Sequence, residues 1–411
     1  MIPPSSSRTM GWRVALAGLG INLALGVLYS WSVVSKNIPA DWHWSEAQRS
    51  LPYSVACLVF SLMMVPAGRL QDLFGPRIVA TAGGLLVGAG LLIASQSTTP
   101  RGYILGFGIL AGAGFGCGYS STTPPAVKWF PSSQTGMIAG LVVAGFGLAS
   151  VYVAPLAEAL ITSHGLPFTM AAFGIGFLSV IVVLSQFLKA PPSGYVPEES
   201  LSQTKKISPL PDKSPMQMLG SGQFYLIWCL YACSAGAGLM IISKLAKMVD
   251  FQAGMKLGFL FVACLAIGNG GGRILAGWLS DRVGRARMLF CCAVIQAICI
   301  LLLSHVHRGG FLASTAPLIL LSALLGANYG ANLALFPSLT KDLYGIKYFG
   351  VNYGLVFTAW GIGGFGLSQL AGYVYDTTKS FSFAYNASAV LLVLAAAGTF
   401  LIKSPSQSKE L

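Results

Sequence analysis

Charged side chains are scarce in this sequence. Only 9% of its 411 residues are Asp, Glu, Lys or Arg, whereas 55% are hydrophobic and the mean hydropathy is +0.71. Soluble domains carry about 25% charged residues, so a soluble protein of this length is excluded. The composition instead indicates a polytopic protein that spans the lipid bilayer.

Acidic residues are fewer still, and patterns typical of catalysis or metal binding are missing. The chain has 12 Asp and Glu against 25 Lys and Arg, a net charge of +13. Such a balance suggests nucleic-acid binding in a soluble domain, but in a membrane protein the position of each charge matters more. The 8 cysteines lie in apolar segments without metal-ligand spacing, which disfavours a disulfide framework and a metal site. No nucleophile–base constellation appears, so we expect neither an enzyme nor a cofactor.

Apolar runs long enough to cross a hydrocarbon core of about 30 Å follow one another along the chain. We predict an all-α integral membrane protein with twelve transmembrane helices in two pseudo-symmetric six-helix bundles, at 1–189 and 220–411. A Pro-containing cytoplasmic linker at 190–219, with room for a short interfacial helix, joins them. The first run is expected to be a retained helix rather than a signal peptide. The predicted helices are 12–35, 47–68, 78–96, 102–127, 136–162, 166–188, 221–243, 254–279, 288–304, 312–340, 348–373 and 382–402.

The basic residues divide unequally between the two sides that these helices define. Sixteen Lys and Arg fall on the side with both termini and the linker, and eight fall on the other. An excess of Lys and Arg marks the cytoplasmic side, so both termini are predicted to be cytoplasmic.

Arg273 is the remaining basic residue, and it falls deep inside the predicted helix 254–279. The next acid along the chain, Asp281, lies eight positions on, roughly 12 Å along a helix. Burying such a charge costs about 2.5–3.5 kcal/mol on insertion scales, so Arg273 needs a partner. An anionic substrate fits, because a guanidinium binds a carboxylate through two parallel hydrogen bonds. The alternative is a structural arginine that pairs with helix carbonyls at a discontinuity created by Gly270–Gly272.

Two short loops repeat at a constant offset of 209 residues. Each combines the end of a helix, an acid, a tight glycine turn and a base, which suits a cytoplasmic loop held by an Asp–Arg contact and helix dipoles. The loops resemble the signature loop of the major facilitator superfamily, whose halves move against each other around a midplane site. The residues of the two loops are Gly68, Asp72, Gly75 and Arg77, and Gly277, Asp281, Gly284 and Arg285.

A second repeat, at an offset of 214 residues, relates glycines of the fifth and eleventh predicted helices. It makes Phe146 and Trp360 pseudo-symmetric partners. The glycines indicate either close helix packing or a flexible backbone near a gate. The matched positions are Gly136, Gly140 and Gly147, and Gly350, Gly354 and Gly361.

Longer motifs resemble the oxalate/formate antiporter family within this superfamily. They are 114–119, 128–131, 269–284, 335–337 and 352–354, together with the glycines of the fifth helix. That family and the related monocarboxylate transporters carry a substrate-binding arginine in helix 8, which falls on Arg273. The resemblance implies a bacterial homologue of the monocarboxylate (L-lactate/proton) transporters, in the inner (plasma) membrane.

Residues at mid-depth complete the predicted site. Asn269, one turn before Arg273, is placed to orient the guanidinium or to meet the ligand. For the tyrosines the alternative is a hydroxyl satisfied by a neighbouring helix, and for the large aromatics it is plain packing. The candidate substrate-binding residues are Arg273, Asn269, Tyr119, Leu28, Tyr29, Phe146, Tyr329, Asn332, Phe336 and Trp360.

Two departures from the antiporter pattern bear on the substrate. Trp360 stands where the antiporter has a second cation, a lysine, and Leu28 stands where it has a polar residue. An oxalate dianion would remain half-neutralised, so we expect a monoanion with a short alkyl part, such as lactate or pyruvate.

Proton coupling is implied by the resemblance to the monocarboxylate transporters, although Asn269 replaces the aspartate that they carry four residues before the arginine. Asp250 and Glu158 are the candidates to exchange a proton, and solvated helix-end charges are the alternative for both. The prediction is a monomeric, proton-coupled symporter of small monocarboxylates. The alternatives are an oxalate/formate-type anion exchanger and a membrane sensor with a transporter fold.

Overall fold

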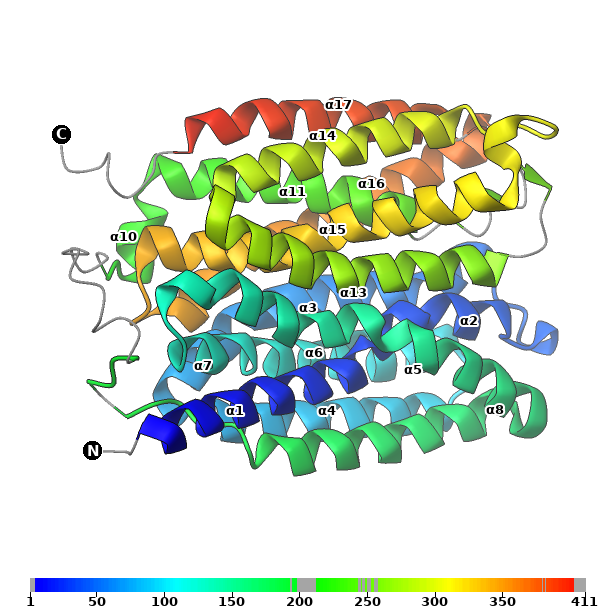
Figure 1. Cartoon of the computed structure of the whole chain (residues 1–411). Helices are drawn as coiled ribbons and strands as arrows, with labels where there is room; N and C mark the ends of the chain where they lie inside the picture. Colours follow the sequence, from blue (N-terminus) through cyan, green and yellow to red (C-terminus); the bar gives the residue numbers. More distant parts are fainter. Residues whose placement is uncertain are drawn as a thin grey trace.

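The computed structural model describes residues 4–192, 194–197, 212–242, 245, 248–249, 253–254, 258–378, 380 and 382–402. Within these residues every regular element is a helix, and long helices run side by side along one common direction (Figure 1). This agrees with the all-α membrane architecture that the apolar runs predict.

The N-terminal half is built from α1 to α8. The fourth membrane crossing combines α5, a π-helical stretch and α6, and α8 contains a break at Gly165, whose φ of 82° and ψ of 169° are not helical. The break divides α8 into the two helices predicted at 136–162 and 166–188. The elements are α1 (Pro4–Leu25), the 3₁₀ segment Gly26–Ser30, α2 (Trp31–Lys36), α3 (Glu46–Phe74), α4 (Pro76–Ser95), α5 (Pro100–Tyr103), the π-helical Ile104–Ala111, α6 (Gly112–Ser120), α7 (Thr123–Lys128) and α8 (Thr135–Ser185).

The C-terminal half follows a short helix, α10, in the predicted linker. Ser214 and Gln217 form a capping box at the start of α10, so this five-residue turn has a local cause. The elements are α10 (Pro215–Leu219), α11 (Gly222–Ile242), α13 (Gly258–Val283), α14 (Arg285–Ser304), α15 (Thr315–Tyr344), α16 (Phe349–Thr378) and α17 (Ser382–Gly398).

The described helices make up twelve membrane crossings. Ten stretches of the described residues are long and apolar enough to cross a bilayer, and the one at Ser132–Ser185 contains two helices because of the break at Gly165. The 30-residue α16 supplies the remaining crossing. The twelve predicted helices are therefore all present.

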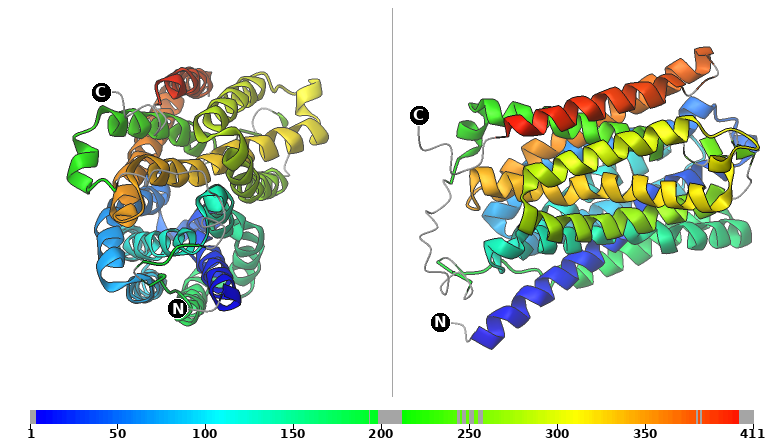
Figure 2. Two further views of the ribbon diagram at one scale, coloured as in Figure 1. Left: turned by 60° about the vertical axis from the view of Figure 1, so that its left-hand side comes forward. Right: turned by 45° about the horizontal axis from the view of Figure 1, so that its top comes forward.

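The two halves lie next to each other along the whole molecule (Figure 2). Helix α1 begins and α17 ends at the same end of the bundle, which we call the basal end (Figure 1). Between the halves, α3 packs along α16 and α8 packs along α13. These two pairs are related by the sequence repeat, so the contact between the halves is itself pseudo-symmetric.

Candidate functional site

Arg273 is completely buried in the middle of α13, at the contact with α8. Its Nε donates a hydrogen bond to Oδ1 of Asn269 at 3.0 Å, and its Nη1 donates to the carbonyl oxygen of Val143 at 2.5 Å. Its Nη2 is buried without a hydrogen-bond partner. The guanidinium therefore keeps unused donor capacity in a place that water does not reach.

Glycines on α8 allow the guanidinium to lie this close to the opposite half. A Cβ atom on Gly147 would lie 3.1 Å from Nε of Arg273 and from Oδ1 of Asn269. A Cβ atom on Gly140 would lie 2.2 Å from the carbonyl oxygen of Arg273. The predicted role of these glycines in close helix packing is confirmed.

The ion pairs of the described residues do not include Arg273. They join Lys128 to Asp72, and Arg285 to both Asp281 and Asp342. Helix α13 continues through Gly270–Gly272, so the predicted alternative of a helix discontinuity at that position is wrong. Arg273 does bond a carbonyl, but that carbonyl belongs to α8 in the other half.

A chain of hydrogen bonds crosses the halves beside Arg273. The hydroxyls of Tyr29 and Tyr329 are 2.8 Å apart, and Nε1 of Trp360 donates to the Tyr329 hydroxyl at 2.8 Å. The positive charge of Arg273 is close enough to the hydroxyl groups of Tyr29, Tyr329 and Tyr119 to interact with them electrostatically. Four of the predicted site residues thus meet around the buried cation.

Aromatic rings fill the space next to these hydroxyls. Phe146 lies edge-on to Tyr29 at 5.0 Å and to Tyr119 at 5.6 Å between ring centroids. Phe60 lies 5.7 Å from Phe146 and 5.4 Å from Trp360. The pseudo-symmetric pair Phe146 and Trp360 therefore contacts a common ring, and both belong to the wall around the cation.

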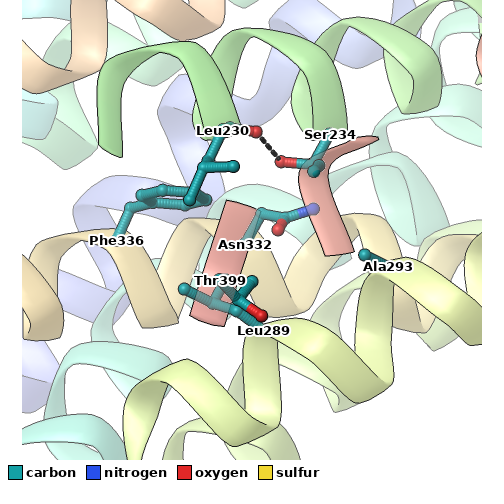
Figure 3. A pocket seen from close by; sticks show the side chains of 8 residues that line it. Leu230, Ser234, Leu289, Ala293, Asn332, Phe336 and Thr399 are labelled. Carbon is teal, nitrogen blue, oxygen red and sulfur yellow. Dashed lines mark hydrogen bonds between the residues drawn. The ribbon is translucent and has the colours of Figure 1, made fainter. Parts of the chain in front are cut away.

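Asn332 and Phe336 face a cavity inside the C-terminal half rather than the guanidinium of Arg273. Both line this small cavity, whose empty volume, including the space at its open mouth, is about 220 Å³ (Figure 3). Nδ2 of Asn332 donates to the carbonyl oxygen of Asn328, and Phe336 stacks on Tyr231 at 4.1 Å. Phe336 thus connects this cavity to the aromatic wall, whereas the Asn332 side chain points into the C-terminal half.

The other predicted residues occupy varied positions. Leu28 is fully buried in the 3₁₀ segment that also carries Tyr29. Glu158 is exposed on α8, seven residues before the break at Gly165, and Asp250 lies outside the described residues.

The two repeated loops close the basal end. Asp281 of α13 accepts hydrogen bonds from the backbone N–H groups of Gly136 and Met137, both at 2.9 Å, at the start of α8. In the other pair Asp72 of α3 accepts from the N–H of Val351 at 3.4 Å, near the start of α16. Each acid therefore lies at the positive end of a helix of the opposite half.

The predicted Asp–Arg contact holds in one loop and differs in the other. Arg285 lies 2.6 Å from Asp281, as expected, but Asp72 pairs with Lys128 at 3.5 Å while Arg77 is exposed. Gly75 and Gly284 adopt φ angles of 87° and 97°, the left-handed region that the predicted tight turns require.

Four aromatic residues near the cation were not among the predicted site residues. They are Phe60, Tyr231, Tyr353 and Phe357. Helical spacing contained a signal for two of them, because Tyr353, Phe357 and Trp360 follow each other at intervals of four and three residues on one face of α16. Phe60 occupies the position in the N-terminal half that corresponds to Asn269 in the C-terminal half, because the two are 209 residues apart, as the repeated loops are.

This arrangement defines a class of protein: a polytopic membrane transporter with a buried cation between two pseudo-symmetric halves. The family model of the Major Facilitator Superfamily matches residues 14–274 and 246–411. The chain belongs to this family. The relatives compared below are transporters rather than enzymes.

Individual comparisons agree with this assignment. The oxalate:formate antiporter of Oxalobacter formigenes is 27% identical over 358 residues, covering 84% of this chain and 80% of the antiporter. Human monocarboxylate transporter 11 is 25% identical over 410 residues, covering 95% and 82%. The solved structure of the proton:xylose symporter XylE has the same fold, with a TM-score of 0.74 at 14% identity over 98% of this chain and 97% of XylE.

Proposed function

We propose that this protein transports small monocarboxylates, of the L-lactate or pyruvate type, through the site at Arg273. The observation that carries the proposal is the state of this guanidinium, which is 0% exposed, bonds only neutral oxygens and retains an unpartnered Nη2. A carboxylate would supply both the missing acceptor and the missing charge.

The charge balance of the site favours an anion of single valence. Trp360 occupies the position at which the antiporter family carries a second cation, and its ring packs against Phe60 and Phe357. A second carboxylate would enter this aromatic wall without a counter-charge, which is unfavourable in a low-dielectric site. A short alkyl chain is compatible with the same wall.

The relatives support an organic anion as cargo, since one is named as an oxalate:formate antiporter and another as a monocarboxylate transporter. We propose symport with a proton by alternating access, with Glu158 and Asp250 as candidate proton carriers. Binding of a carboxylate neutralises Arg273, which lowers the electrostatic barrier to moving the halves past each other. The alternative is an oxalate/formate-type anion exchanger.

The proposed orientation places the basal end, and with it both termini and the linker, in the cytoplasm of a bacterial cell. The protein would be a monomer in the inner membrane, with bundles at 1–189 and 220–411 moving as units. In the described conformation the contacts of Asp72 and Asp281 hold the basal end together. The substrate would then enter from the opposite side.

Purified protein in liposomes tests the proposal. A pH gradient, acidic outside, is expected to drive L-lactate uptake without any anion inside. Arg273→Ala should abolish this uptake, and Arg273→Lys should restore little of it because a point charge lacks the two-pronged geometry of the guanidinium. Uptake that ignores the pH gradient and requires a trans anion would identify the exchanger instead.

A further inference from the structure

Three buried tyrosine hydroxyls in the aromatic wall beside Arg273 make no hydrogen bond of full geometry. They belong to Tyr119, Tyr231 and Tyr353, whose side chains are at most 1% exposed. Buried hydroxyls are nearly always hydrogen-bonded, and leaving one unpaired is unfavourable. Three of them in one place indicate a group that is bound there at another stage of the transport cycle.

The three tyrosines surround one ring. The centroid of Phe357 lies 5.4 Å from that of Tyr119, 6.1 Å from that of Tyr231 and 5.7 Å from that of Tyr353. Tyr353 lies within electrostatic range of both other hydroxyls. The three hydroxyls therefore converge, and their contacts with one another fall short of full hydrogen-bond geometry.

The cluster is assembled from both halves of the protein. Tyr119 lies on α6 of the N-terminal half, whereas Tyr231 and Tyr353 lie on α11 and α16 of the C-terminal half. The charge of Arg273 lies within electrostatic range of Tyr119 and Tyr231. A ligand that binds Arg273 and this cluster together would contact both halves, as a transported substrate must.

We propose that the hydroxyls of Tyr119, Tyr231 and Tyr353 form a second subsite. This subsite binds an uncharged hydroxyl or carbonyl oxygen of a substrate whose carboxylate group is held by Arg273. The inference rests on the proposed function and narrows its substrate class to hydroxy- or oxo-carboxylates over unsubstituted alkyl acids. Neutral phenols donate to and accept from a hydroxyl, and donate to a carbonyl, without the cation that a second carboxylate would require.

Selectivity follows from the same chemistry. A site built to bond a hydroxyl rejects the analogue that lacks it, because the polar groups of the site then remain unpaired. The wild-type protein should therefore take up a hydroxylated acid faster than the alkyl acid of equal length. The position of the hydroxyl on the preferred substrate, next to the carboxylate or one carbon further away, shows how far the subsite lies from Arg273.

The test measures uptake into liposomes of propionate, lactate and 3-hydroxypropionate by the wild type and by Tyr231→Phe and Tyr353→Phe. Each variant removes one hydroxyl and should lower the preference for the favoured hydroxy acid over propionate by about threefold to tenfold, the effect of one net hydrogen bond. Tyr225→Phe, on the exposed side of the same helix α11, is the matched control and should keep the wild-type preference. Thermal unfolding of each variant verifies that it folds.

The outcomes separate this inference from the proposed function. Uptake of all three acids that depends on Arg273, with no preference for an oxygenated one and no effect of either variant, would overturn the subsite and leave the proposed function standing. Absence of any uptake that depends on Arg273 would overturn the proposed function itself.

Discussion

The side chains around Arg273 determine which ligand the proposed site would accept. The guanidinium is held by one amide oxygen and one backbone carbonyl, from opposite halves. Both are neutral, so under the proposed function a carboxylate that replaces the Val143 carbonyl would gain a full ion pair while Arg273 keeps its contact with Asn269. The protein thus orients the guanidinium without neutralising its charge, as the proposed binding of an anion requires.

Asn269→Asp changes this balance by giving the protein an internal anion at the position that now lies 3.0 Å from Nε. An ionised aspartate would pair with Arg273 and compete with the substrate, so uptake should fall at neutral pH. Acidification protonates the aspartate and frees the guanidinium, so the deficit should shrink at low pH. Initial rates of L-lactate uptake at two pH values measure the effect.

Asn269→Leu is the control for that substitution, because it removes the hydrogen bond and adds no charge. It should lower uptake by a similar factor at both pH values. A deficit of Asn269→Asp that does not change with pH would show that the added carboxylate does not pair with Arg273.

Trp360→Lys is expected to shift selectivity from monocarboxylates towards oxalate or another dicarboxylate. The lysine would place a second cation where the indole now bonds the Tyr329 hydroxyl, and so compensate a second carboxylate. Competition of oxalate against labelled lactate measures the shift. Trp360→Phe, which lacks the charge, should show no gain for oxalate, and equal selectivity of the two variants would mean that this wall does not contact the substrate.

Among the elements, the helix pairs α3–α16 and α8–α13 set how closely the halves approach. A Cβ atom on Gly277 would lie 2.1 Å from the carbonyl oxygen of Gly136, and one on Gly68 would lie 2.3 Å from that of Gly350. Small residues of this kind allow helix backbones to touch in a membrane. The repeated glycines therefore have a packing role at matched places in both halves.

Gly277→Ala is expected to slow transport several-fold, because the added methyl group prevents α13 from closing against α8. Gly271→Ala, on the same helix, meets nothing within 4 Å and is the matched control, with transport close to wild type. Liposome uptake and thermal unfolding of the two proteins provide the comparison. Equal loss in both variants would point to a general effect of alanine in α13.

At the level of elements, sequence reasoning predicts most of this structure. Long apolar runs identify the twelve crossings, and the repeats identify the glycine turns at Gly75 and Gly284. The pairing of Asp72 with Lys128, and the inward orientation of Asn332, could not be predicted. Both depend on how a helix is rotated against its neighbours, and helices that are apolar all round carry no periodic signal for that rotation.

For the whole molecule, the central feature is that two acids hold the basal end together across the pseudo-symmetry. Asp281 binds the first turn of α8 and Asp72 binds near the start of α16. Asp281→Asn removes a charge from one positive helix end, so the closed basal arrangement should become less populated. Hydrogen exchange of backbone amides should then rise in the first turns of α8 and α16 together, because the halves separate as units.

Asp342→Asn is the matched control for this prediction. Asp342 pairs with Arg285 within the C-terminal half, and the contacts of Asp281 with the start of α8 do not involve it. Exchange in both first turns should stay at the wild-type rate. A rise limited to α8 in Asp281→Asn would indicate local fraying of one helix rather than separation of the halves.

The most direct test of substrate binding at Arg273 is an experimental structure of the protein with a transported carboxylate bound. If Arg273 binds the substrate, the carboxylate lies against Nη1 and Nη2 of Arg273 and the Val143 carbonyl no longer accepts from the guanidinium. A structure in which Arg273 keeps its contact with Val143, or pairs with an acid of the protein, while the carboxylate lies elsewhere would contradict it.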